Sequence, residues 1–95
     1  MRSPELLLVA IVEMTPGQAE AGQRYEDAVL ELLDRHGGTL ERRTRSTDNA
    51  AEVHLIRFQN RAGFESFMND PDRVAHRAHA GAAAPTTRVI EVLDV

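Results

Sequence analysis

The chain has 95 residues, a formal net charge of −4 and no cysteine, so we expect one domain, 1–95, without disulfides or thiolate metal sites. Its eleven basic residues are all arginine, and the acidic balance argues against nonspecific nucleic-acid binding, which requires a basic surface. Because a domain of this size buries only a modest part of its surface, we expect self-association to add stability.

The segment 5–14 is a nearly continuous run of apolar residues, which predicts a strand covered on both faces. This run is too short to span a bilayer. A cleavable signal sequence is the alternative, because Arg2 precedes the run and residues 19–21 have the small-x-small form of a cleavage site. Glu13 interrupts that pattern, so we expect a cytoplasmic protein that does not bind membranes.

The next segment, 15–18, reads Thr-Pro-Gly-Gln, and this capping-box pattern predicts that a helix begins here. Apolar residues at spacings of three and four then form one stripe, and the acidic residues are expected to point outward. The stripe consists of Tyr25, Ala28, Val29, Leu32 and Leu33, and the outward set of Glu26, Asp27, Glu31 and Asp34. Gly37 and Gly38 are expected to end the helix, since glycine accepts the left-handed conformation.

Two strands joined by a hairpin are expected next. Residues 39–45 alternate in polarity, residues 46–51 contain turn formers, and residues 52–59 are again typical of a strand. Because side chains alternate along a strand, His54, Ile56 and Phe58 share one face.

A second helix follows, with Asn60 placed as its N-cap. Its apolar face comprises Phe64, Phe67 and Met68. The Asp-Pro pair at 70–71 interrupts this helix and begins one or two further turns. Residues 81–85 are then expected to form a linker and residues 86–95 a fourth strand.

The predicted order β-α-β-β-α-β is that of the ferredoxin-like α+β sandwich, in which both helices cover one face of a four-stranded antiparallel sheet. The other face would be exposed in a monomer. The first and last strands nevertheless carry apolar residues at both parities, in segments 6–12 and 89–95. A large exposed apolar face usually marks an interface. We therefore expect a homodimer that pairs through its sheet faces.

Three segments carry a resemblance to known proteins. They are 25–38, a tyrosine-bearing helix that ends in paired glycines; 54–59, an apolar strand with a phenylalanine near its end; and 61–77, where an Ala-Gly-Phe helix runs into Asn-Asp-Pro. In these segments the chain resembles the dimeric α-β barrel superfamily, and within it the DUF1330 family. Two positions depart from that pattern: Arg73 stands where the family commonly has tyrosine, and residues 44–47 replace a glycine-containing segment.

The resemblance implies a dimeric α-β barrel with a cavity between the sheet and the helices. Related barrels include cofactor-free quinone-forming monooxygenases, polyketide cyclases, chlorite-dismutase-like haem proteins and stress-response proteins. The expected function is therefore that of a homodimer that binds an aromatic or polyketide-like compound. If it is an enzyme, the resemblance favours a cofactor-independent monooxygenase, cyclase or isomerase, and no cofactor is expected. The competing hypothesis is a noncatalytic binding or assembly protein, in which phenylalanine side chains fill the space between helices and sheet.

His54 is the first candidate for proton transfer, because its imidazole would enter the cavity if the face that it shares with Phe58 meets the helices. The alternative is a partly exposed histidine near the start of its strand. Tyr25 is the second catalytic candidate, since its hydroxyl could orient an enolate. A structural hydrogen bond would explain a buried tyrosine equally well.

The residues predicted to bind substrate are Arg42, Arg57, Phe58, Phe67, Arg73 and His76. Two arginines on adjacent strands could bind a carboxylate or phenolate, or pair with acidic side chains at an interface. Arg73 could guard a pocket mouth, and the phenylalanines could be core residues instead. His76 and His79 lie three residues apart and could ligate a metal or haem, or interact with the helix end. No metal site is assigned.

Overall fold

The computed structural model describes residues 4–95, so Arg2, which enters the signal-sequence alternative, lies outside the described residues. The elements are β1 (Leu6–Glu13), α1 (Ala19–Leu30), the 3-10 turn η1 (Leu33–His36), β2 (Gly38–Arg45), β3 (Ala51–Phe58), α2 (Arg61–Met68), α3 (Pro71–Ala80), the 3-10 turn η2 (Gly81–Ala83) and β4 (Thr86–Val92). This order confirms the predicted α+β ferredoxin-like fold, with its second helical segment divided into α2 and α3.

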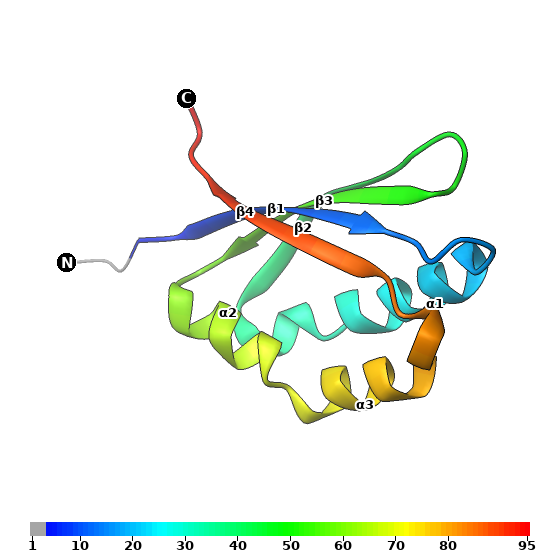
Figure 1. Ribbon diagram of the computed structural model, residues 1–95. Helices are drawn as coiled ribbons and strands as arrows, with labels where there is room; N and C mark the ends of the chain where they lie inside the picture. Colours follow the sequence, from blue (N-terminus) through cyan, green and yellow to red (C-terminus); the bar gives the residue numbers. More distant parts are fainter. Residues whose placement is uncertain (1–3) are drawn as a thin grey trace.

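The four strands form one antiparallel sheet in the order β2-β3-β1-β4. The helices α1, α2 and α3 lie on one side of this sheet, and among the described residues 4–95 no helix covers the other side (Figure 1). None of the helices within residues 4–95 is both long and apolar enough to cross a bilayer. The fold is therefore a two-layer sandwich with one uncovered sheet face in the single chain.

The pairing of β1 with β3 decides which side chains face the helices. Ala10 lies opposite His54, and paired residues in an antiparallel sheet point to the same face. His54, Ile56 and Phe58 are all buried, which confirms that this face of β3 meets the helices. Val53, on the opposite face, is 43% exposed.

The predicted apolar stripe of α1 and the following turn forms most of the helical side of the core. Its buried members are Tyr25, Val29, Leu32 and Leu33, which cluster with Leu6, Leu8, Ile56, Phe58 and Phe67. Burying each large apolar side chain of this kind contributes about 1.5–3 kcal/mol. The regular helix ends at Leu30 and continues as η1, and Gly37 then takes the left-handed conformation at φ 69°.

The start of α1 differs from the capping-box prediction. Pro16 and Gly17 lie in a turn, and the helix begins at Ala19 with a Gln18 N-cap that makes no side-chain cap hydrogen bond. Thr15, the expected capping residue, instead donates its hydroxyl to the carbonyl of Ala82 at 3.1 Å. A long-range contact with the segment before β4 thus replaces the local cap.

Both later helices begin with a side-chain cap: the Asn60 cap was predicted, and the Asp70 cap lies at the predicted Asp-Pro start. Asn60 accepts a hydrogen bond from the backbone N–H of Gly63 at 2.9 Å, and Asp70 accepts one from the N–H of Asp72 at 2.8 Å. Each carboxyl or amide oxygen satisfies a donor that a helix start leaves free. α3 has no fully buried residue, so it covers the sandwich from outside rather than building its core.

Candidate functional site

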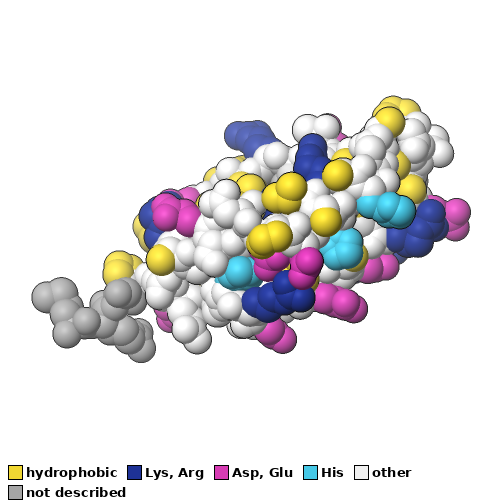
Figure 2. Space-filling model, turned by 90° about the horizontal axis from the view of Figure 1, so that it is seen from below, with side chains coloured by type: hydrophobic (Ala, Val, Ile, Leu, Met, Phe, Trp, Pro, Cys, Tyr) yellow, Lys and Arg dark blue, Asp and Glu magenta, His cyan; other side chains and the backbone are white. Residues whose placement is uncertain are grey.

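A cavity of about 390 Å³ lies between the helices and the sheet, within the range of small-molecule sites. The predicted site residues that line it are Tyr25, His54, Phe58, Phe67 and Arg73. Figure 2 views the molecule from the helical side, where apolar, histidine and charged side chains are interspersed on the surface. A partly open, mainly apolar cavity therefore lies between the two layers, beneath a mixed surface.

Aromatic side chains build one wall of this cavity. The ring of Phe58 packs against Phe64 and Phe67 at centroid distances of 5.6 and 5.7 Å. The guanidinium of Arg73 lies 5.4 Å from the centroid of the Phe67 ring, a cation–π distance. The phenylalanines thus line the cavity without filling it. An aromatic ligand in the cavity could pack against these rings.

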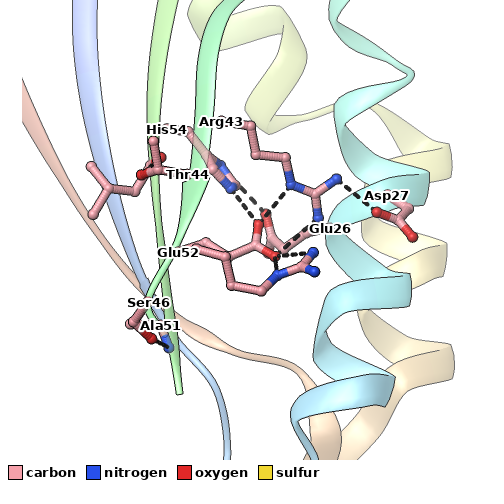
Figure 3. A network of polar contacts seen from close by, with 10 residues as sticks. Glu26, Asp27, Arg43, Thr44, Ser46, Ala51, Glu52 and His54 are labelled. Atoms are coloured by element: carbon pink, nitrogen blue, oxygen red, sulfur yellow. Dashed lines mark hydrogen bonds and ion pairs between the residues drawn. The ribbon is translucent and has the colours of Figure 1, made fainter. Parts of the chain in front are cut away.

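Glu52 is the buried centre of a polar network that joins β3, β2 and α1 (Figure 3). Its carboxylate is fully buried and accepts hydrogen bonds from Arg43 at 2.8 Å, from Arg45 at 2.9 Å and from His54 at 2.7 Å. Burial alone would raise the pKa of Glu52, but these hydrogen bonds outweigh it and lower the pKa to about 2. Glu52 is therefore ionised at neutral pH.

The ionised Glu52 determines the tautomer of His54. A carboxylate only accepts hydrogen bonds, so Nε2 of His54 carries the proton that points at Oε1 of Glu52, 2.7 Å away. Burial lowers the pKa of His54 despite this partner, and the imidazole is neutral at neutral pH. Nδ1 is then left with a lone pair, which makes it a candidate base.

Glu26, like Glu52, is a site residue that the sequence analysis missed. It was expected to point outward, but it is only 6% exposed and lines the cavity, with Oε1 at 3.9 Å from Nδ1 of His54. Burial and the nearby Glu52 carboxylate raise the pKa of Glu26 to about 7. A signal was present, because Glu26 stands four residues after the buried Gly22 and three before Val29.

Two polar atoms near the cavity have no protein partner. Among residues 4–95, the hydroxyl of Tyr25 and Nε of Arg73 are buried without a hydrogen bond. Both residues line the cavity. A buried polar atom without a partner is costly, so these two atoms mark where a ligand could supply one.

The other predicted site residues lie elsewhere. Arg57 is on the uncovered sheet face, where it donates to Glu41 at 2.9 Å and to Asp94 at 3.2 Å. Arg42 is exposed and pairs in register with Leu55, which shares that face. Neither arginine lines the cavity described above, so a binding role for them stays a prediction about the open face.

His76 also lies outside the main cavity. It lines a smaller one of about 350 Å³ together with His79 and Tyr25. Within residues 4–95, no group of three or more His, Asp or Glu side chains is arranged to hold a metal ion. Tyr25 is the residue that lines both cavities. A substrate-binding role for His76 stays a prediction.

A second polar chain joins η1 to α2 and α3. Nδ1 of His36 lies 2.7 Å from the Ser66 hydroxyl, and Nε2 lies 2.7 Å from Asp70. The order resembles a hydrolytic triad. Ser66, however, sits inside α2, so its N–H belongs to the helical hydrogen-bond ladder and does not serve as an oxyanion donor. We interpret this chain as a structural clasp.

Comparison with known proteins gives no match among family models or curated sequences. Solved structures with the same fold do match. SnoaB of Streptomyces nogalater, a cofactor-independent oxygenase, superposes with a TM-score of 0.78 at 16% identity over 98% of this chain and 95% of its own. PA3566 of Pseudomonas aeruginosa gives a TM-score of 0.78 at 19% identity, over 100% of this chain and 98% of its own.

A third match is a Bacteroides thetaiotaomicron protein that is provisionally named an antibiotic biosynthesis monooxygenase. It superposes with a TM-score of 0.80 at 12% identity, over 96% of this chain and 90% of its own. At such identities the likeness concerns the backbone alone. The chain thus shares the α+β ferredoxin-like fold of these structures.

Proposed function

We propose that this chain binds an aromatic or polyketide-like compound in the cavity between sheet and helices and removes a proton from it without a cofactor. The observation that carries the proposal is the neutral His54, which lines an apolar cavity while Nε2 is held by the ionised Glu52. Likeness in fold to a cofactor-independent oxygenase supports it. The closer relationship to the DUF1330 family stays a prediction.

Proton removal would begin at Nδ1 of His54. A ligand C–H or O–H group next to an aromatic ring or carbonyl loses its proton to this nitrogen, and Glu52 stabilises the imidazolium that forms. Tyr25, which lines the cavity, would hold the oxygen of the enolate that results. Because the lining of the cavity is mostly apolar, these charges interact more strongly than they would in bulk water.

Glu26 would carry the proton onward. Its carboxyl group lies 3.9 Å from Nδ1 of His54 and has a pKa near 7, so it can accept a proton from the imidazolium and return it to product at neutral pH. His54 would thus act as the base that takes the proton from the substrate, and Glu26 as the acid that returns it to the product.

Oxygenation is the outcome that the structural likeness favours. The electron pair of the enolate carbon forms a bond to O₂, and protonation gives a hydroperoxide. Loss of water from a CH₂ site then leaves a ketone, so that the substrate and O₂ become ketone and H₂O. Without O₂, the same deprotonation would lead to isomerisation or cyclisation.

The test is oxygen uptake with a panel of aromatic carbon acids that contain an acidic CH₂ group, such as anthrone. We expect His54→Ala to reduce turnover by at least ~100-fold, the usual contribution of a general base. His79→Ala is the matched control, because it is exposed and does not line the main cavity. Undiminished turnover in His54→Ala would remove His54 from the mechanism.

We also propose that two copies pair through their uncovered sheet faces. Alternate residues of β1 and its neighbours place apolar side chains on this face, including Val9, Ile11, Val53, Leu55 and Ile90. Exposed apolar surface of this extent favours an interface. Sedimentation as a single 10.5 kDa particle at micromolar concentration would contradict the dimer.

The noncatalytic hypothesis expects the space between helices and sheet to be filled by Phe58, Phe64 and Phe67. These rings instead line a cavity of about 390 Å³, which favours ligand binding. If none of the aromatic compounds tested binds, the noncatalytic hypothesis of an assembly protein is favoured instead.

A further inference from the structure

We infer that the cavity selects aromatic ligands that carry an anionic oxygen, and that Tyr25 and Arg73 bind this oxygen. The inference rests on the proposed function and narrows its ligand to aromatic carboxylates or phenolates. It starts from the two buried polar atoms without a partner, the hydroxyl of Tyr25 and Nε of Arg73, on residues that line the same cavity.

The chemistry of these atoms defines what they can bind. An arginine Nε–H only donates, whereas a tyrosine hydroxyl both donates and accepts. The ligand atom that satisfies Arg73 must therefore be an acceptor. A carboxylate or phenolate oxygen can receive both hydrogen bonds, and charge-assisted hydrogen bonds are the stronger ones.

The guanidinium of Arg73 is held in place before any ligand binds. Its Cζ lies 5.4 Å from the Phe67 ring centroid, and Nη1 donates a hydrogen bond to the carbonyl of Met68 at 3.4 Å. Neither contact uses Nε, which is buried without a hydrogen-bond partner within residues 4–95. A donor held in this way loses little conformational freedom on binding, which favours affinity.

Local charge agrees with an anionic ligand. Arg77 lines the cavity as well, and the ion pairs formed within residues 4–95 involve neither Arg73 nor Arg77. Glu26 is the opposing group, since its carboxylate would repel an anion. Its pKa near 7 means that a substantial fraction is neutral at physiological pH, which weakens that repulsion.

The experiment compares two fluorescent probes that differ by a single anionic group, anilinonaphthalene sulfonate and its uncharged parent phenylnaphthylamine. Dissociation constants are measured by fluorescence titration of the full chain. We expect the sulfonate to bind at least ~10-fold more tightly, as hydrogen bonds to a charged group allow. Displacement of both probes by an aromatic carboxylate such as naphthoate would place them in one site.

Variants then assign the preference to residues. Arg73→Gln should abolish the preference for the sulfonate, because it weakens sulfonate binding far more than binding of the uncharged probe. Arg73→Lys should restore part of it through charge, and Tyr25→Phe should reduce it about fivefold, the value of one hydrogen bond. Arg88→Gln is the matched control, because Arg88 lies opposite Ile11 on the uncovered sheet face. Circular dichroism establishes that each variant is folded.

Three outcomes would overturn the inference: equal affinity for the two probes, a preference that survives Arg73→Gln, or a preference that Arg88→Gln removes. The first two leave the cavity occupied, so the proposed function would stand while the ligand class would change. The third would place the anion on the open sheet face. Binding of neither probe would count against the inference and against the proposed cavity ligand together.

Discussion

Nε2 of His54 lies 2.7 Å from Oε1 of Glu52, and the two residues stand on alternate positions of the same strand, β3. This pair joins the cavity to the arginine cluster behind it, because Glu52 also accepts hydrogen bonds from Arg43 and Arg45. Glu52 therefore orients His54, and the two arginines in turn hold the Glu52 carboxylate in place.

Glu52→Gln should lower kcat while KM stays nearly unchanged. The amide keeps the shape of the carboxyl group but does not select the Nε2–H tautomer or stabilise the imidazolium, and we expect a loss of ~100-fold or more. The measurement is steady-state oxygen uptake over a range of substrate concentrations. A variant with unaltered kcat would show that the His54–Glu52 pair has a structural role alone.

Acid should destabilise the protein through Glu52. Its pKa falls from 4.5 to about 2 on folding, so its stabilisation is complete above pH 4.5 and is lost as pH falls through about 2. The loss amounts to roughly 3 kcal/mol. Urea unfolding across this pH range measures it, and Glu52→Gln should show a flatter profile. Parallel profiles for both proteins would contradict the assignment.

Glu26→Gln should stabilise the protein at high pH. Folding raises the pKa of Glu26 from 4.5 to about 7, so ionisation of the buried carboxyl costs stability as pH rises through this window. The gain in unfolding free energy should be larger near pH 8 than near pH 4 by roughly 3 kcal/mol. Asp27→Asn, at the exposed neighbouring position, serves as control and should lack this pH-dependent gain.

Removal of the His36 clasp should destabilise the junction between η1 and the later helices. Asp70 is 5% exposed, and the hydrogen bond from His36 lowers the pKa of Asp70. We expect His36→Ala to cost about 1–3 kcal/mol, since it leaves a buried carboxylate with one partner fewer. Ser66→Ala should cost less, because it leaves the His36–Asp70 contact intact. Equal losses in thermal melts would argue against the clasp.

Val53→Glu should convert the proposed dimer to monomers. Val53 is 43% exposed in the single chain, so the fold tolerates a charge there, whereas a dimer interface would bury it without a partner. Sedimentation velocity of the wild type and the variant at equal concentration decides the question. The same mass for both, whether dimeric or monomeric, would contradict pairing through this face.

The sequence determined the features that depend on local backbone geometry. The alternation of β3 predicted that His54, Ile56 and Phe58 share a face, and the side chain of Asn60 predicted the cap of α2. The Asp-Pro pair at 70–71 likewise predicted the start of α3. These patterns are readable because strand and helix periods are set by the backbone of a few successive residues.

Only the tertiary structure decided which groups meet across elements. The register irregularity between Leu40 and Arg42 places Arg43 beside Glu52, and the packing of α1 on the sheet brings Glu26 within 3.9 Å of His54. A one-residue slip would send each side chain to the other face. Register and helix placement follow from the whole core, so residues far apart in the chain had to be positioned together before the site could be recognised.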